Sequence, residues 1–268
     1  MRVEIEVWRQ DSPEADGRFE THVVEDATPE MSLLELLDRL NDQLAEGGVE
    51  PIQFESDCRE GACGACGVTV NDTPHGPVPQ TPSCRQHLRA FGPGRGGSPN
   101  LDSGSSASAN LDLGSLLKLR IEPLRSAAFP VVRDLVVDRS SLDRLIQAGG
   151  HVDVTTGTAP DADDLLIGHD DAELALDFAA CIGCGACVAA CPNGAAHLFA
   201  GAKLAHLALL PHGKLERTRR AGAVVDQLDG EFGPCSSYGE CVEVCPAGIP
   251  LTAVAAVHRE KLRAAFRR

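Results

Sequence analysis

Asp57–Gly67 has the sequence DCREGACGACG, and Cys181–Pro192 has the sequence CIGCGACVAACP. The chain contains eleven cysteines, and all of them fall into three groups with short spacings. The groups are Cys58, Cys63, Cys66 and Cys84; Cys181, Cys184, Cys187 and Cys191; and Cys235, Cys241 and Cys245. An odd number of cysteines arranged in CxxC clusters indicates metal binding rather than disulfide bonds.

The composition narrows the class of protein. A net charge of −15 argues against nucleic acid as a partner. The first residues, MRVEIEVWRQ, lack the apolar core of a signal peptide, so we expect the reducing cytoplasm. The longest apolar run, Ala195–Leu210, contains three polar or charged residues, so we expect no membrane-spanning helix. The basic end, His258–Arg268, is most simply a solvated helix end, with an anionic lipid surface or a partner as the alternative.

The N-terminal third has the pattern of strands around one helix. Alternating or β-rich segments predict strands at Val3–Trp8, Arg18–Val24, Gly67–Val70 and Lys118–Leu124. A capping box, Ser32-Leu33-Leu34-Glu35, predicts a helix that ends at Gly47-Gly48. The Gly/Ser-rich stretch 92–113 has little to bury, and we expect it to be a mobile loop.

The second half is expected to be helical. The segment Ala127–Gly150 connects the halves and includes a short helix, Leu142–Ala148. From Asp177 onward the pattern is helical, interrupted by the cysteine loops, and the predicted helices are Ala195–Leu210, Lys214–Leu228 and Leu251–Phe266. Because the halves differ in character, we predict an α+β protein of two domains, 1–126 and 127–268.

The first cysteine group has the plant-type [2Fe–2S] spacing, C-x4-C-x2-C followed by a distant cysteine. Gly61, Gly64 and Gly67 would let the backbone turn tightly and direct N–H groups at the cluster. The competing interpretation is a zinc site, but zinc ribbons prefer two CxxC knuckles. His75 and His87 are interpreted as loop and packing residues. We therefore predict that Cys58, Cys63, Cys66 and Cys84 hold a [2Fe–2S] cluster.

The other two groups are bacterial-ferredoxin runs, each ending in Cys-Pro. In the second run Tyr238 stands where the middle cysteine would be. In two-cluster ferredoxins the fourth cysteine of a run binds the other cluster. The predicted ligand sets are therefore Cys181, Cys184, Cys187 and Cys245 for a [4Fe–4S] cluster, and Cys191, Cys235 and Cys241 for a [3Fe–4S] cluster. The alternative for the second set is a [4Fe–4S] cluster with Tyr238 or water on the fourth iron.

These residues resemble the iron–sulfur subunits of succinate dehydrogenase and fumarate reductase, the complex II family. The resemblance depends on DCREGACGACG, on Phe129–Gly150 and on both cysteine runs. His75-Gly76-Pro77, Cys84–Leu88 and Ala205–Pro211 look like the branch of the family that uses menaquinone. The resemblance covers nearly the whole chain.

The resemblance implies an N-terminal β-grasp ferredoxin domain and a C-terminal all-helical, bacterial-ferredoxin-like domain. It implies two partners, a flavoprotein with FAD that oxidises succinate and a membrane anchor that binds quinone and often haem b. Electrons would pass from FAD through the [2Fe–2S], [4Fe–4S] and [3Fe–4S] clusters to the quinone. The chain would lie peripherally on the cytoplasmic face of the cell membrane, with no substrate chemistry of its own.

Two departures from the family pattern concern the quinone site. Many relatives have an aromatic residue shortly after the first Cys-Pro, whereas this chain has Asn193-Gly194-Ala195-Ala196-His197. Those relatives also have a histidine after the first cysteine of the second run, where this chain has Ser236. No quinone site is therefore assigned to this chain.

Two other functions compete. The first is a relay subunit of another flavin dehydrogenase, of the glycolate or heterodisulfide type, with a soluble acceptor. Many such relatives keep a full cysteine set, so Tyr238 favours the complex II family over them. The second is a scaffold held together by zinc, which iron and sulfide analysis would distinguish.

Overall fold

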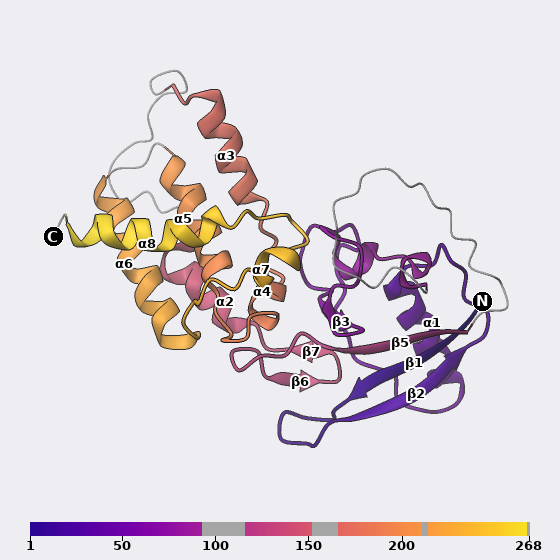
Figure 1. Cartoon of the computed structure of the whole chain (residues 1–268). Coiled ribbons are helices and arrows are strands. Elements are labelled where there is room, and N and C mark those ends of the chain that lie inside the picture. The colour runs from indigo at the N-terminus through magenta and orange to yellow at the C-terminus, as the bar shows by residue number, and fades with distance from the viewer. Residues whose placement is uncertain (93–115, 152–165, 211–213, 267–268) are drawn as a thin grey trace. The chain divides into compact units, whose positions relative to one another are not determined.

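The computed structural model describes residues 1–92, 116–151, 166–210 and 214–266. They form two compact units, Met1–Arg125 with Phe129–Asp138, and Ser126–Ala128 with Arg139–Arg268. The first unit contains the five-stranded sheet and helix α1, and the second contains helices α2–α8 (Figure 1). Apart from its first residue, the stretch 92–113 that was predicted to be mobile lies outside the described residues. No helix within the described ranges combines the length and apolar composition needed to span a membrane.

The sheet of the first unit has the strand order β2-β1-β5-β3-β4. Strand β1 pairs antiparallel with β2 and parallel with β5, and β3 pairs antiparallel with β5 and β4. The strands are β1 (Arg2–Arg9), β2 (Arg18–Val24), β3 (Val68–Val70), β4 (Thr73–Pro74) and β5 (Leu116–Pro123). The four predicted strands are confirmed, with ends shifted by one or two residues, and β4 was not predicted.

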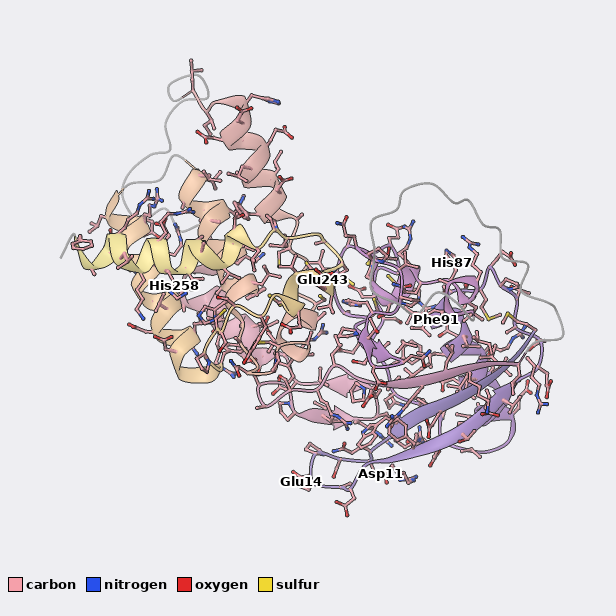
Figure 2. All side chains as sticks on the ribbon, viewed as in Figure 1. Asp11, Glu14, His87, Phe91, Glu243 and His258 are labelled. Carbon is pink, nitrogen blue, oxygen red and sulfur yellow. The ribbon has the colours of Figure 1, made fainter. Side chains whose placement is uncertain are left out.

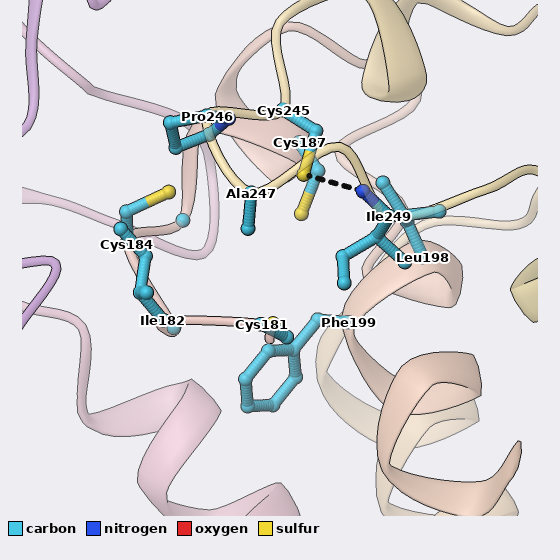
Figure 3. A pocket seen from close by; sticks show the side chains of 12 residues that line it. Cys181, Ile182, Cys184, Cys187, Leu198, Phe199, Cys245, Pro246, Ala247 and Ile249 are labelled. Atoms are coloured by element: carbon cyan, nitrogen blue, oxygen red, sulfur yellow. Dashed lines mark hydrogen bonds between the residues drawn. The ribbon is translucent and has the colours of Figure 1, made fainter. Parts of the chain in front are cut away.

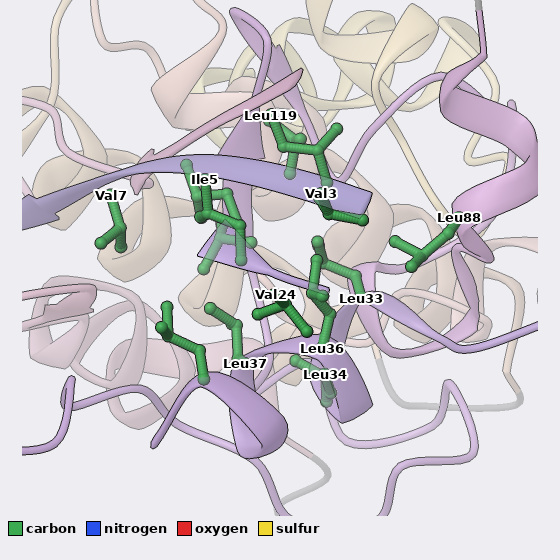
Figure 4. Close-up of a cluster of buried hydrophobic side chains, with 14 of the residues drawn as sticks. Val3, Ile5, Val7, Val24, Leu33, Leu34, Leu36, Leu37, Leu88 and Leu119 are labelled. Carbon is green, nitrogen blue, oxygen red and sulfur yellow. The ribbon is translucent and has the colours of Figure 1, made fainter. Parts of the chain in front are cut away.

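One helix, α1 (Leu33–Glu46), packs its leucines on this sheet (Figure 4). The predicted capping box is confirmed, since Glu35 N–H donates to Ser32 Oγ at 3.2 Å and Ser32 N–H donates to Glu35 Oε2 at 2.6 Å. The helix ends before Gly47, as predicted. Leucines from α1 and the inward residues of β1 are buried together. The helix places apolar residues on one face every 3.6 residues and the strand places them on one face every second residue, so the two apolar faces pack on each other.

A hairpin that the sequence did not predict closes the first unit. It consists of β6 (Val131–Arg133) and β7 (Val136–Val137), and its turn contains Asp134. The buried Asp134 carboxylate accepts hydrogen bonds from Gln10 N–H at 3.0 Å, Gln53 N–H at 2.9 Å and Arg9 Nη1 at 3.1 Å. These bonds explain why Phe129–Asp138, which follows the predicted boundary at residues 126 and 127, belongs to the first unit.

The second unit is helical. Its helices are α2 (Ser140–Leu145), which continues into a π-turn (Ile146–Gly150), α3 (His169–Ala179), α4 (Ala186–Ala189), α5 (His197–Leu209), α6 (Lys214–Glu231), α7 (Glu240–Glu243) and α8 (Thr252–Ala265). The three predicted long helices are confirmed as α5, α6 and α8. Helix α3 begins at His169, earlier than the predicted Asp177. The sequence did not reveal this start, because the helix buries only Ala175 and Phe178 and so shows little apolar periodicity.

Helices α6 and α8 share a buried ion pair. Glu260 on α8 is 2% exposed, and Arg217 on α6 donates to both of its carboxylate oxygens at 2.6 Å. Arg263 adds a third hydrogen bond at 3.1 Å. Burial alone would raise the pKa of Glu260, but the hydrogen bonds and charge of Arg217 outweigh it, so the pKa lies below its usual 4.5.

We expect Glu260→Gln to lower the free energy of unfolding near neutral pH by about 2 kcal/mol, because it removes charge-assisted hydrogen bonds. The folded pKa is depressed, so the stabilisation is present above pH 4.5 and is lost as the pH falls through the folded pKa. Thermal unfolding of both proteins across acidic pH measures the difference. The control is Asp229→Asn, which removes an exposed ion pair to Lys261 on the same two helices and should have little effect. An unchanged difference at low pH would contradict the assignment.

Candidate functional site

The first cysteine group lies in the first unit, in the loop before β3 and in a short 3₁₀ helix, Ser83–Arg85. Cys66 and Cys84 are buried, whereas Cys58 is half-buried and Cys63 is exposed. Three backbone N–H groups, those of Glu60, Ala62 and Cys63, donate to Cys58 Sγ at 3.3–3.4 Å. The loop therefore directs its amides at a sulfur, as Fe–S sites require.

Two glycines in this loop have a left-handed backbone conformation, which lets the chain turn tightly. Gly61 and Gly64 have φ of 84° and 75°, where glycine has no steric penalty. A Cβ on Gly61 would lie 3.2 Å from Pro82 Cγ, so the segment before Cys84 packs closely against the loop. Gly67 does not share this left-handed conformation.

The thiols of this group differ in their electrostatic environment. The N–H groups of Glu60 and Ala62 lower the pKa of Cys58 from 9.0 to about 7. Burial raises the pKa of Cys66 to about 12, and the neighbouring Cys84 thiol contributes to this increase. The Cys63 thiol also affects the pKa of both Cys58 and Cys66. The pKa values of Cys58 and Cys66 therefore depend on the neighbouring thiols of the same group.

A buried polar network, which sequence reasoning missed, holds the segment around Cys84. His75 Nδ1 accepts a hydrogen bond from Ser83 N–H at 3.2 Å and lies 2.9 Å from Ser83 Oγ. Gln86 donates from Nε2 to the carbonyls of Val78 and Thr81, both at 3.0 Å. The interpretation of His75 as a packing residue is consistent with these bonds. No signal in the sequence identified Gln86, because polar residues in loops are usually solvated.

The second unit contains a cavity lined by four cysteines from two distant segments (Figure 3). They are Cys181, Cys184, Cys187 and Cys245. Apolar side chains form most of the remaining wall, including Leu198, Phe199 and Ile249. Ile249 N–H donates to Cys245 Sγ at 3.4 Å. The arrangement brings the last cysteine of the second run to the first three of the first run, as the crossed ligand assignment requires.

The mostly apolar wall of the cavity disfavours charged thiolates. Burial raises the pKa of Cys184 to about 12, and it raises the pKa of Cys187 well above 9.0. Two cations lie near the same loop, since Arg139 Nη1 donates to Cys184 O at 3.3 Å and Lys203 Nζ donates to Cys181 O at 3.4 Å. Four cysteines that line one apolar pocket fit an iron–sulfur cluster bound by thiolates. They fit a solvent-exposed reactive thiol less well.

The remaining three cysteines are Cys191, from the first run, and Cys235 and Cys241, from the second run. Burial raises the pKa of Cys241, and the nearby Cys191 and Cys235 thiols raise it further. Asn193 Nδ2 donates to Pro234 O at 2.9 Å and to Ser236 Oγ at 2.8 Å, which ties the two cysteine segments together. These two polar residues stand at positions where the sequence departs from the family pattern, and their mutual contact was not predicted.

The backbone of the second run repeats that of the first. Gly185 precedes α4 and Gly239 precedes α7, and both are left-handed. Gly183 has φ of 68°, and Ser237, at the corresponding position, has φ of 57° although it is not glycine. Tyr238 corresponds to Cys184, and its side chain is 61% exposed. The loop therefore keeps the shape of a four-cysteine run while one thiol is absent.

Comparisons with known proteins agree with this arrangement. Residues 4–144 match the family model described as a 2Fe-2S iron-sulfur cluster binding domain, and residues 180–249 match a 4Fe-4S dicluster domain. The chain is 30% identical to the succinate dehydrogenase iron-sulfur subunit of Bacillus subtilis, over 81% of this chain and 75% of that protein. It is also 30% identical to the fumarate reductase iron-sulfur subunit of Haemophilus influenzae, over 93% of this chain and 89% of that protein.

A solved structure has the same fold. A chain of the Mycobacterium smegmatis Sdh1 complex in the apo form superposes with a TM-score of 0.65 at 21% identity, covering 100% of this chain and 97% of that one. The extent of these matches, together with the two cluster-binding domains, decides the family. This chain belongs to the iron–sulfur subunits of succinate dehydrogenase and fumarate reductase.

Proposed function

We propose that the chain is the electron-transfer subunit of a succinate:menaquinone oxidoreductase or fumarate reductase. Its partners are a flavoprotein that contains FAD and a membrane anchor that binds quinone, as anchors that often also bind haem b do. The chain lies peripherally on the cytoplasmic face of the membrane. The observation that supports this most strongly is the apolar cavity lined by Cys181, Cys184, Cys187 and Cys245, which come from two distant segments.

The ligand sets of the proposal follow these groups. Cys58, Cys63, Cys66 and Cys84 hold a [2Fe–2S] cluster, the four cysteines of the cavity hold a [4Fe–4S] cluster, and Cys191, Cys235 and Cys241 hold a [3Fe–4S] cluster. When bound, such clusters accept and donate single electrons. The exposure of Tyr238 supports a third site with three protein ligands over one in which the phenol binds iron. The sheet order of the first unit and the packing of helix α1 on the sheet support the β-grasp interpretation.

The other residues of the chain position the cysteine ligands and set the polarity around them. Backbone N–H groups donate to Cys58 Sγ and stabilise negative charge there. Leu198 and Phe199 exclude water from the cavity. Asn193 holds the second run against the first. The three groups contain no paired acid and base for succinate chemistry, so we assign that chemistry to the flavoprotein.

The activity test uses the full chain purified without oxygen. We expect iron and sulfide, three distinct paramagnetic centres by electron paramagnetic resonance, and no succinate oxidation until the flavoprotein is added. Robust succinate oxidation by the chain alone would refute the proposal. Zinc in place of iron would indicate the scaffold interpretation, and three centres without a [3Fe–4S] signal would favour a relay subunit of another flavin dehydrogenase.

The crossed ligand assignment has its own test. Cys245→Ser should remove the [4Fe–4S] signal and leave the [3Fe–4S] signal, because Cys245 lines the cavity with the first run. Cys191→Ser is the matched control at the equivalent position of the other run, and it should remove the [3Fe–4S] signal alone. If each variant instead lost the cluster of its own run, the ligand sets would be uncrossed.

A further inference from the structure

Helix α8 has apolar residues on two opposite faces. One face, which includes Val254 and Val257, is buried against the other helices of the unit. The opposite face exposes Leu251, Leu262 and Phe266, and the last two are 59% and 86% exposed. Positions 251, 255, 258, 262 and 266 recur every three or four residues, so they form one stripe along the helix. A solvated helix normally presents a polar outer face, whereas this one combines polar residues with the exposed side chains of Leu262 and Phe266.

Cations border the exposed stripe. Arg259, Lys261 and Arg263 are each about half exposed, and His258 lies on the same helix (Figure 2). These cations outnumber the carboxylates that they contact. The buried Glu260 carboxylate interacts with Arg259 and Arg263, and it also accepts hydrogen bonds from Arg217. Asp229, which contacts Lys261, is the other nearby carboxylate in the described contacts. The patch is therefore locally basic on a chain with a net charge of −15.

This combination differs from the exposed apolar residues of helix α3 in the same unit. Helix α3 also exposes two leucines, Leu174 and Leu176. Its flanking charges are acidic, namely Asp170, Asp171, Glu173 and Asp177. Exposed apolar residues alone thus do not distinguish the two helices, whereas the sign of the surrounding charge does.

We propose that the exposed face of α8, defined as Leu251, Arg259, Lys261, Leu262, Arg263 and Phe266, lies on an anionic phospholipid surface. Leu262 and Phe266 enter the boundary between headgroups and acyl chains, and the three cations contact lipid phosphates. An apolar stripe bordered by Lys and Arg is the pattern of interfacial helices. Anionic lipids can move laterally to meet cations on both sides of the stripe, which matches this charge distribution.

This contact goes beyond the proposed function, because it needs neither a membrane anchor nor bound quinone. It concerns the second unit alone. A failure of the lipid contact can be distinguished from a failure of the electron-transfer function, because vesicle binding and cluster content are measured separately on the same sample.

The test is co-sedimentation of the full, cluster-containing chain with vesicles. One set contains phosphatidylglycerol in phosphatidylcholine, and the other is pure phosphatidylcholine. We expect binding to the anionic vesicles only, and loss of binding at high salt, because screening shortens the reach of exposed charges. Arg259→Gln with Lys261→Gln and Arg263→Gln should weaken binding about a hundredfold, and Leu262→Ser with Phe266→Ser should weaken it without changing its salt dependence.

Matched controls separate the patch from general effects. Leu174→Ser with Leu176→Ser removes exposed leucines from α3, and Arg2→Gln with Lys118→Gln removes exposed cations from the sheet. Both should bind vesicles as the unmodified chain does, and all variants should keep their clusters. Equal weakening by the controls, or no binding to anionic vesicles, would overturn the proposal. If the α8 variants detach from cell membranes although the unmodified chain ignores vesicles, the face binds a protein and the lipid assignment is wrong.

Discussion

Gly201→Ala is expected to destabilise the helical unit by about 2 kcal/mol and to lower its melting temperature by about 5 °C. A Cβ at this position on α5 would lie 2.0 Å from Ala253 O and 2.6 Å from Ala253 C in the first turn of α8. These are backbone atoms, so no rotamer change can relieve the overlap, and the two helices must separate. The higher helix propensity of alanine, about 1 kcal/mol, offsets only part of the cost.

The separation of α5 and α8 should also change the position of the cysteines that line the cavity. Helix α8 begins shortly after Cys245, and Ile249 N–H donates to Cys245 Sγ. Moving α8 would therefore move a proposed ligand, and we expect the variant to hold less iron and sulfide. Gly222→Ala is the matched control, because Gly222 lies inside α6 with no atom within 4 Å of its added Cβ. It should raise stability by up to about 1 kcal/mol. Unchanged melting of Gly201→Ala would contradict the close approach of α5 and α8.

Tyr238→Cys is expected to convert the third centre from [3Fe–4S] to [4Fe–4S]. Position 238 corresponds to Cys184 in the first run, and the neighbouring residues have matching left-handed backbone. Ser237 takes the conformation of Gly183, and Gly239 takes that of Gly185. A thiol at position 238 would supply the missing fourth ligand, and thiolate is the ligand that Fe–S iron prefers. The oxidised variant should lose its [3Fe–4S] resonance and contain more iron.

Tyr238→Ser is the control for this substitution, because it removes the phenol without adding a thiol. It should keep the [3Fe–4S] signal of the unmodified chain. If the unmodified chain lacked that signal and Tyr238→Ser changed its spectrum, the phenol would bind a fourth iron, as the alternative interpretation holds. If Tyr238→Cys kept the three-iron signal, the loop would not present position 238 to the centre.

Local patterns in the sequence were sufficient for most of the elements. The alternation of Val3, Ile5 and Val7 predicted β1, and the capping box at Ser32 predicted the start of α1. These features depend on neighbours in the chain, since side-chain period and helix capping are local properties. The hairpin of β6 and β7 was not predicted, because it depends on Asp134 meeting Gln10 and Gln53 from distant segments. Helix α3 was predicted only from Asp177 onward, because so few of its residues are buried.

For the candidate site, spacing predicted the cysteine groups and the pairing of Cys245 with the first run, because each cluster type constrains the number of residues between its ligands. Only the tertiary structure decided what surrounds them. The contact of Asn193 with Ser236 and the apolar wall that Phe199 forms beside Cys245 join residues far apart in sequence. Burial and hydrogen-bond partners arise when distant segments pack, and no local pattern encodes them.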